Sequence, residues 1–506
     1  MTATQTAPPT DQPSRFGSVY RRILAGSGTY SLATLVTRCS SLLMLPLFTR
    51  CISAGEYGTM EILDVSLNVF GMIFGANFSL ALFYHYWATE SITERKTVIG
   101  TTVLGSAVLG MLAAGIGIAA ARPISTLIFQ QPEYAYYIRI MLLNFAFTLP
   151  LEAVLQWLRA TDRARSFVAV TVVRVGLAMV LNVVLLAFLR LGLKGVVWSN
   201  LATSSSLAIL SAAYCLRENA VSFQPRLFAK LFRYSIPVTL TGVALFTIHY
   251  ADRFFLKRYT TLAEIGVYSL AYKIGMLISN AHLAFQSYWT SQIFVLLKGK
   301  TGADLFSAVF TYVMLSLAAI ALLLAVLCGP ALTIIAGPDY WPARILVPYI
   351  LAAYLLRAAG DHFRCIFYTE NRPELDARLN WTGAAVCGAA YIVFIPLYHV
   401  WGAVLATFIA FATIAVLGFR WIRRLRIIHL EGARLAKICV SACLAAAVSH
   451  AVPNAPMVLS AVLNGLVFLL FPLSLWLLGF TTVEERSLIA DGWRRVRRVA
   501  GVAVSA

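Results

Sequence analysis

Several basic side chains lie inside long apolar blocks of the sequence, where a charge is costly. Placing a charge at the centre of a bilayer costs about 2.5–3.5 kcal/mol, so such residues usually face protein or water. Guanidinium groups bind phosphate oxygens through paired hydrogen bonds, and ammonium groups attract the same anions. Some of these bases lack an obvious acidic partner. We therefore predict a positively charged cavity for an anionic headgroup, with the binding residues Arg38, Arg174, Arg253, Lys273 and Arg357.

Polar side chains recur near these cations every three or four residues, a spacing that places them on one face of a helix. The pattern is clearest from Tyr268 to Gln286. Tyrosine, serine, asparagine and glutamine together offer flat apolar faces and hydrogen bonds, which suit sugars. We expect a polar stripe along the same cavity, made of Ser31, Thr34, Asp64, Asn68, Tyr268, Tyr272, Ser279, His282 and Gln286.

Acidic residues beside the cations could gate the cavity or carry a coupling ion. His249 and Asp252 lie within one helical turn of Arg253, so they could change partners or take up a proton. Local charge neutralisation near a span end is the other interpretation, and the sequence leaves both open. The gating or ion-coupling candidates are Glu61, His249, Asp252 and Asp361. For Glu152 and Arg159, interhelical bonding and snorkelling are equally good interpretations.

The elements that hold these side chains must be membrane spans. Of 506 residues, 59% are hydrophobic and 12% are charged, against about 25% charged in soluble domains. Apolar blocks long enough for a bilayer crossing, which needs about 20 residues, recur along the whole chain. We predict an all-α polytopic membrane protein with about fourteen transmembrane helices, at 26–49, 60–87, 98–121, 138–158, 166–189, 193–216, 234–256, 265–296, 305–335, 345–368, 377–398, 400–421, 434–451 and 456–479.

The net charge of +19 is distributed unevenly over the predicted loops. Fourteen spans place both termini on one side, and most loop arginines and lysines fall on that side. The positive-inside rule therefore predicts a multi-pass membrane protein with both termini in the cytoplasm. Topology and attraction to anionic lipid headgroups explain the basic excess, so we predict membrane lipids and no nucleic acid as partners.

A repeated motif predicts an internal duplication. TRCISAGEYG (49–58) and KRYTTLAEIG (257–266) share an arginine, five further residues and then Glu-x-Gly, 208 residues apart. Both copies follow spans of the same direction, which predicts two six-helix lobes in a parallel pseudo-two-fold repeat. The expected segments are a cytoplasmic N-terminal tail (1–25), an N-lobe (26–216), an inter-lobe linker (217–233), a C-lobe (234–421), two C-terminal helices (422–479) and a basic cytoplasmic tail (480–506).

Motifs for catalysis are missing from the sequence. None of the seven histidines lies in an HExxH motif, no phosphate-binding GxxxxGK[ST] loop occurs, and the cysteines show no metal-ligand spacing. A polytopic glycosyltransferase, the remote alternative, would need acidic residues on a sizeable outer loop. The longest predicted outer loop, 122–138, has only one acidic residue, Glu133. We predict no enzyme, no catalytic residue, no metal and no cofactor.

Three stretches carry a family resemblance: RFFLKRYTTLAEIGVYSLAYKIG (253–275), SLATLVTRCSSLLMLPLFTRCISAGEYGTMEI (31–62) and LPLEAVLQWLRATDRAR (149–165). They resemble the polysaccharide and O-antigen (Wzx-type) flippases of the multidrug/oligosaccharidyl-lipid/polysaccharide exporter superfamily. The resemblance implies movement of undecaprenyl-diphosphate-linked oligosaccharide from the inner to the outer leaflet of the bacterial cytoplasmic membrane by alternating access, for O-antigen or exopolysaccharide biosynthesis. It also implies a coupling ion, H+ or Na+, and work alongside polysaccharide polymerase machinery. In such flippases Arg38 and Arg253 would be cavity cations.

Two functions within the same superfamily compete with this expectation. An ion-coupled multidrug antiporter would usually have twelve spans and an acidic cavity, which the basic surplus disfavours. A flippase for the lipid precursor of peptidoglycan would differ mainly in its substrate. The sequence does not separate these two flippases.

Overall fold

The computed structural model describes residues 36–37, 40, 43–74, 78–219, 221–297, 302–425, 428–451 and 457–481. All regular structure in this part of the chain is helical, which confirms the predicted all-α polytopic fold. By length and apolar composition, nine of these helices could each cross a membrane, or up to eleven if each of two bent pairs counts as one span. The predicted first span, 26–49, lies mostly outside the described residues, and the total of fourteen stays a prediction.

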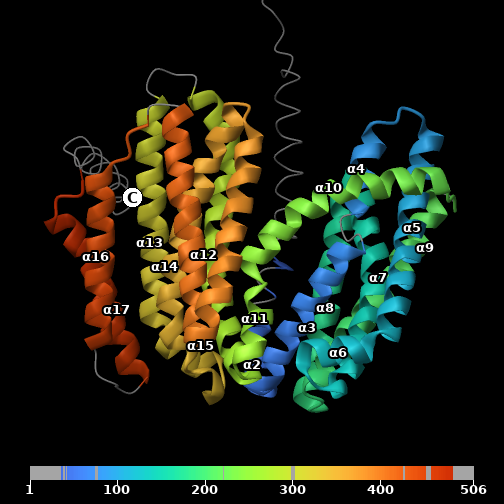
Figure 1. Ribbon diagram of the computed structural model, residues 1–506, viewed down its shortest axis with the longest axis horizontal. Helices are drawn as coiled ribbons and strands as arrows, with labels where there is room; N and C mark the ends of the chain where they lie inside the picture. The colour runs from blue at the N-terminus through green and yellow to red at the C-terminus, as the bar shows by residue number, and fades with distance from the viewer. Residues whose placement is uncertain are drawn as a thin grey trace, which may run out of the picture. The chain divides into compact units, whose positions relative to one another are not determined.

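The described chain divides into two compact units, drawn in Figure 1. Unit 1 comprises the described residues up to Ile52 together with Ile62–Val243. Its helix α7 packs against α5, α8 and α9, and the fully buried Trp157 of α7 lies in the main core of the unit. The elements of unit 1 are α2 (Leu45–Cys51), the second part of α3 (Ala54–Ile73), α4 (Phe78–Trp87), α5 (Ile92–Ala119), α6 (Ala121–Phe129), η1 (Pro132–Tyr134), α7 (Ala135–Ala160), α8 (Ala164–Asn182), η2 (Val183–Phe188), α9 (Leu193–Asn219) and most of α10 (Pro225–His249).

Unit 2 comprises Ser53–Glu61 and the described residues from Ala244 onward. Helix α14 packs against α12, α13 and α15, while α16 and α17 pack against each other and against α13. The elements of unit 2 are the start of α3, the end of α10, α11 (Asp252–Tyr259), α12 (Leu262–Leu296), α13 (Gly302–Ile335), η3 (Pro338–Tyr340), α14 (Ala343–Thr369), α15 (Pro373–Leu425), α16 (Gly432–Ala451) and α17 (Met457–Leu477).

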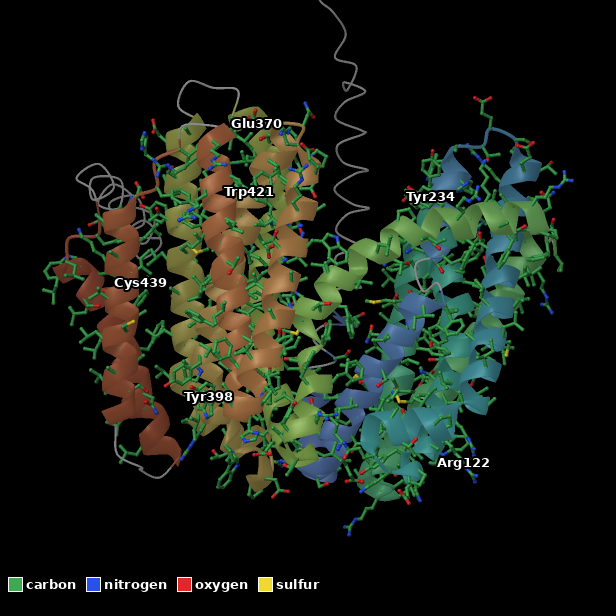
Figure 2. The ribbon with its side chains drawn as sticks, in the orientation of Figure 1. Arg122, Tyr234, Glu370, Tyr398, Trp421 and Cys439 are labelled. Atoms are coloured by element: carbon green, nitrogen blue, oxygen red, sulfur yellow. The ribbon has the colours of Figure 1, made fainter. Side chains whose placement is uncertain are left out.

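Helix α15 contains two of the predicted spans. A straight helix of its 53 residues would be about 80 Å long, far more than the hydrocarbon core of about 30 Å. At His399 the backbone leaves the helical conformation, with φ of 52°. Figure 2 places Tyr398 and Trp421 toward opposite ends of unit 2, with Glu370 near Trp421. The kink at His399 therefore divides α15 into two limbs, as the spans 377–398 and 400–421 predict.

The repeated motif forms the same local structure in both copies. Ser53 and Glu56 make reciprocal bonds before α3: the Ser53 N–H donates to Glu56 Oε2 at 3.1 Å, and the Glu56 N–H donates to Ser53 Oγ at 3.2 Å. Thr261 and Glu264 do the same before α12, at 2.8 and 3.2 Å. Each pair is a capping box, which satisfies backbone N–H groups at a helix start. The motif is therefore a helix N-terminus, used twice.

Candidate functional site

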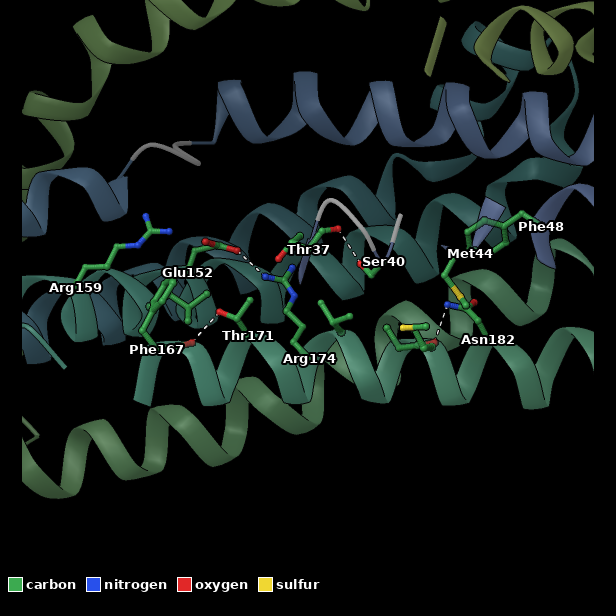
Figure 3. A pocket seen from close by; sticks show the side chains of 14 residues that line it. Thr37, Ser40, Met44, Phe48, Glu152, Arg159, Phe167, Thr171, Arg174 and Asn182 are labelled. Atoms are coloured by element: carbon green, nitrogen blue, oxygen red, sulfur yellow. Dashed lines mark hydrogen bonds and ion pairs between the residues drawn. The ribbon is translucent and has the colours of Figure 1, made fainter. Parts of the chain in front are cut away.

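A cavity of about 520 Å³ opens in unit 1 between three helical segments (Figure 3). Ligand pockets commonly measure about 300–1,000 Å³, so this one could hold a polar headgroup of moderate size. In each segment the lining residues recur mostly three or four positions apart, because those positions share a helix face. The lining residues are Thr37, Ser40, Met44, Phe48, Glu152, Leu155, Arg159, Phe167, Thr171, Arg174, Val175, Ala178, Met179 and Asn182.

Helix α8 forms the long wall of this cavity. Thr171, Arg174 and Asn182 lie along the wall in a sequence that is otherwise mostly valine, alanine and leucine. Little of the span Ala164–Phe188 is buried inside the protein, so its remaining apolar surface suits lipid. An apolar span with one polar face is the arrangement expected where a helix separates lipid from a wet cavity.

An ion pair crosses the cavity wall. Arg174 of α8 donates from Nη1 to Glu152 Oε1 of α7 at 2.9 Å. Figure 3 shows the Arg174 guanidinium turned toward Glu152. Neither side chain is buried, with 33% of Arg174 and 43% of Glu152 exposed. A guanidinium with an accessible edge can form further hydrogen bonds with an anionic ligand.

Arg159 of α7 adds a second cation to the cavity lining. Its guanidinium carbon lies 4.5 Å from the ring centroid of Phe167, and no acidic partner is found for it among the described residues. The described lining thus has two arginines and one glutamate. This surplus of positive charge favours an anionic ligand over a cationic one.

Asn182 lies at the end of the polar face of α8. Its Nδ2 donates to the carbonyl of Ala178 at 2.8 Å, while its Oδ1 is buried and has no hydrogen-bond partner in the structure. Buried polar atoms are usually paired, so an unpaired one at a cavity wall can accept a bond from a ligand or from water. Asn182 therefore extends the hydrogen-bonding surface beyond the two arginines.

Three of the predicted cavity residues lie outside the described residues: Arg38, Ser31 and Thr34. Arg174 is placed in the cavity, and its role in binding stays a prediction. Asp64 and Asn68 are half-buried and exposed on α3, where Asn68 Nδ2 donates to the Asp64 carbonyl at 2.9 Å.

Arg253, with the neighbouring His249 and Asp252, lies in the interior of unit 2. Asp252 is fully buried and Arg253 is 2% exposed. Arg253 Nη1 donates to Asp252 Oδ1 at 2.8 Å and to the His249 carbonyl at 2.7 Å. The Tyr268 hydroxyl donates to Asp252, and the ring of Tyr272 lies 4.5 Å from the guanidinium. These contacts join α10 and α11 to α12, so in this structure Arg253 faces protein.

Lys273 of α12 pairs with Glu61 of α3 inside unit 2. Its Nζ also donates to the Tyr57 hydroxyl at 2.7 Å. The Lys273 side chain is 41% exposed, while Glu61 is buried. Tyr340, which lies outside the predicted spans, packs edge-on against Tyr57. Burial is the main cause that raises the pKa of the Tyr340 phenol far above its ordinary range, and the nearby Tyr57 is the second.

Arg357 belongs to a chain of alternating charges between α14 and α15. It binds Asp361 through Nε and Nη2, each at 3.0 Å. Arg364 links Asp361, at 2.8 Å, to Asp376, which it binds through both Nε and Nη2. Tyr368 and Asn380 complete the shell of Asp376, so this carboxylate has several donors. The cluster holds two helices together through charge-assisted bonds.

The predicted stripe of α12 runs largely through protein contacts. Tyr268 and Tyr272 are fully buried, and His282 is buried against the ring of His362, while Ser279 is half-buried. Gln286 Nε2 donates to the Asp361 carbonyl of α14 at 2.7 Å. The spacing does define one face of α12. In unit 2 much of that face packs against α14.

Sequence reasoning placed Glu152 and Arg159 outside the binding set and did not single out Thr171 or Asn182. A signal was available, because Thr171, Asn182 and Arg174 are the polar side chains of α8 from Phe167 onward and share a helix face. Whether Glu152 meets Arg174 depends on how α7 and α8 pack, which neither helix encodes alone.

Comparisons with known proteins show a family and a fold. A family model described as "Polysaccharide biosynthesis protein" matches residues 23–289. The structure is similar to that of the lipid II flippase MurJ in an inward closed conformation, with a TM-score of 0.70 and 13% identity, covering 88% of this chain and 97% of that one. No curated protein sequence matches the chain.

A second similar structure is an inward-facing multidrug resistance MATE family transporter of the MOP superfamily. Its TM-score is 0.65 at 16% identity, and the match covers 76% of this chain and 94% of that one. At such identities the likeness shows a shared fold.

Proposed function

Because the chain belongs to the polysaccharide biosynthesis protein family, we propose that it is a flippase for lipid-linked oligosaccharide. It moves an undecaprenyl-diphosphate-linked glycan from the inner to the outer leaflet of the bacterial cytoplasmic membrane by alternating access, for O-antigen or exopolysaccharide biosynthesis. The family match agrees with the resemblance found in the sequence, and the chain is a multi-pass membrane protein. Both termini are cytoplasmic in this proposal.

The substrate explains why a protein is needed and what it must provide. A saccharide diphosphate cannot cross hydrocarbon unaided, because its charges and hydroxyls would lose their hydration. The polyprenyl tail is soluble in the bilayer throughout. The protein therefore needs to enclose only the head, and no covalent chemistry is required.

The cavity of unit 1 is the observation that carries this proposal. Arg159 and Arg174 supply guanidinium groups for phosphate oxygens, and Asn182 supplies an unpaired acceptor for a sugar hydroxyl. Of the residues predicted as cavity cations, we retain Arg174 in this role and propose Arg159 beside it. Arg253 and Arg357, each bound by a carboxylate, are proposed to support the fold of unit 2.

Two related functions, peptidoglycan-precursor flippase and multidrug antiporter, differ from the proposed one in the ligand they bind. A flippase for the peptidoglycan precursor would use the same phosphate chemistry with another glycan. A multidrug antiporter would bind cations, which the surplus of arginine in the cavity disfavours. Coupling to H+ or Na+ and cooperation with a polymerase also belong to the proposal.

Reconstituted full-length protein tests the function directly. We expect proteoliposomes to move a fluorescent undecaprenyl-diphosphate oligosaccharide between leaflets, and we expect Arg174→Gln and Arg159→Gln to slow this transfer at least tenfold. Arg163→Gln is the control, since Arg163 pairs with Glu218 elsewhere in unit 1. Efflux of cationic dyes without lipid transfer would overturn the proposal. Rescue of a strain that lacks its lipid II flippase, but not of one that lacks its O-antigen flippase, would reassign the glycan.

A further inference from the structure

Glu152 is the one acidic residue that lines the described part of the unit 1 cavity. It pairs with Arg174 through one nitrogen, Nη1 to Oε1 at 2.9 Å, and more than two fifths of its side chain is exposed. Arg357 and Arg364, in contrast, each bind a carboxylate through two nitrogens. The Glu152 pair is therefore the looser arrangement, with one edge of the guanidinium still accessible.

A carboxylate and a phosphate compete for the same guanidinium. Both anions use two oxygens against the N–H fork, and a diphosphate bound at both ends carries two negative charges against the one of a carboxylate. A partly exposed ion pair gains little over the hydrated ions, so its members exchange partners readily. A diphosphate that enters this cavity can therefore replace Glu152 on Arg174.

We propose that Glu152 is a displaceable counter-anion, which holds Arg174 in place when the cavity is empty and limits how tightly the cavity retains a diphosphate. The inference rests on the proposed function and names a residue that regulates the same site. Glu152 is a positioning residue, because it acts on the ligand through Arg174. When the ligand leaves, Glu152 returns to Arg174 and assists release.

The physical reason is that a carrier must release what it binds. A site must be favourable enough for the ligand to enter and weak enough for it to leave. Two arginines facing a diphosphate with no internal competitor would retain it. The Glu152 carboxylate lowers the affinity of the cavity for the diphosphate without removing the arginine donors that recognise it.

Glu152→Gln tests this inference because it keeps the shape of the side chain and removes its charge. We expect the purified full-length variant to bind inorganic pyrophosphate about tenfold more tightly than the unmodified protein in calorimetric titrations. We also expect its lipid transfer to saturate at a lower substrate concentration and with a several-fold lower maximal rate. Glu152→Asp, which keeps the charge, should restore both values toward those of the unmodified protein.

Glu218→Gln is the matched control. It removes the partner of Arg163, from a pair of similar exposure, 38% and 33%, in the same unit but outside the cavity. This variant should change neither pyrophosphate affinity nor the saturation of transfer. If Glu152→Gln does not fold, Glu152→Ser replaces it, with the same expected gain in affinity.

Two outcomes separate the inference from the function on which it rests. Unchanged or weaker pyrophosphate binding by the folded Glu152 variants, while Arg174→Gln abolishes it, would overturn the counter-anion and leave the flippase proposal in place. Absence of pyrophosphate binding by the unmodified protein, together with normal transfer by Arg174→Gln, would overturn both the cavity's proposed role and the inference.

Discussion

Gly58 and Gly266 occupy equivalent positions in the repeated motif, and each lies against the backbone of the other's helix. A side-chain carbon on Gly58 would collide with the Leu262 carbonyl, and one on Gly266 would collide with the Ala54 carbonyl. Ala54 and Leu262 are themselves 208 residues apart, like the two glycines. Within unit 2, α3 and α12 therefore cross with local two-fold symmetry.

This crossing should not tolerate alanine at either glycine. Because the obstructing atoms belong to backbone, they cannot move aside as a flexible side chain would. We expect Gly58→Ala and Gly266→Ala each to lower the free energy of unfolding by about 1–3 kcal/mol, the usual effect of overpacking. Thermal unfolding of the purified protein measures this. Gly55→Ala is the control in the same helix, since nothing lies within 4 Å of the added carbon. Equal stability of all three variants would contradict the crossing.

Removal of the Arg253 side chain should lower the stability of unit 2 and leave pyrophosphate binding by the folded protein unchanged. Arg253→Ala leaves Asp252 buried and without its ion-pair partner, which typically costs about 3–5 kcal/mol. The double variant Asp252→Asn/Arg253→Met should be more stable than Arg253→Ala, because it leaves no charge unpaired. Chemical unfolding in detergent compares them. A stable Arg253→Ala protein with weakened pyrophosphate binding would instead favour the cavity role predicted from the sequence.

The two-nitrogen contact between Arg364 and Asp376 should depend on the guanidinium shape. Lysine keeps the charge but cannot place two donors on one carboxylate. We expect Arg364→Lys to lower the free energy of unfolding by about 1.5–3 kcal/mol, the range for hydrogen bonds to charged groups. Arg372→Lys is the control, because its pair with Glu374 is about half exposed and should contribute about 0–1 kcal/mol. A double-mutant cycle with Asp376→Asn should assign the loss to this pair, and an additive cycle would contradict it.

Asn182 offers a test of charge at the far end of the cavity wall. Asn182→Asp adds a negative charge, which should repel a diphosphate and reduce both pyrophosphate affinity and lipid transfer at least several-fold. Asn182→Ala removes the amide without adding charge and separates the two effects. Calorimetry with pyrophosphate measures the difference. Equal affinities of the two variants would argue that the anion does not approach Asn182.

Hydrophobic length and helical spacing were enough to predict the all-α polytopic fold class. Apolar blocks of bilayer length are visible in the sequence without knowledge of packing. The two spans predicted on either side of residue 399 therefore match the kink at His399. The repeated Glu-x-Gly motif also predicted a duplication, although its capping boxes and the glycine crossing required the structure. Periodicity identifies a helix face, but it does not say what that face contacts.

The candidate site was harder to predict for the same reason. The sequence predicted that Tyr268 and Tyr272 line the cavity as part of a polar stripe. In unit 2, however, their neighbours are other protein side chains. For Arg253 the sequence left a cavity role and local neutralisation by Asp252 both open, and the structure shows the ion pair with Asp252. Glu152 and Arg174 are 22 positions apart on different helices, so their contact is a property of tertiary packing.

The paired ions of unit 2 bear on how membrane voltage could act on this protein. Glu61, Asp252, Asp361 and Asp376 are matched by Lys273, Arg253, Arg357 and Arg364. Moving one elementary charge through 100 mV is worth about 2.3 kcal/mol, but a displacement of matched ions together transfers no net charge across the field. Electrical work in a transport cycle would then fall on the bound anion and on the arginines that accompany it.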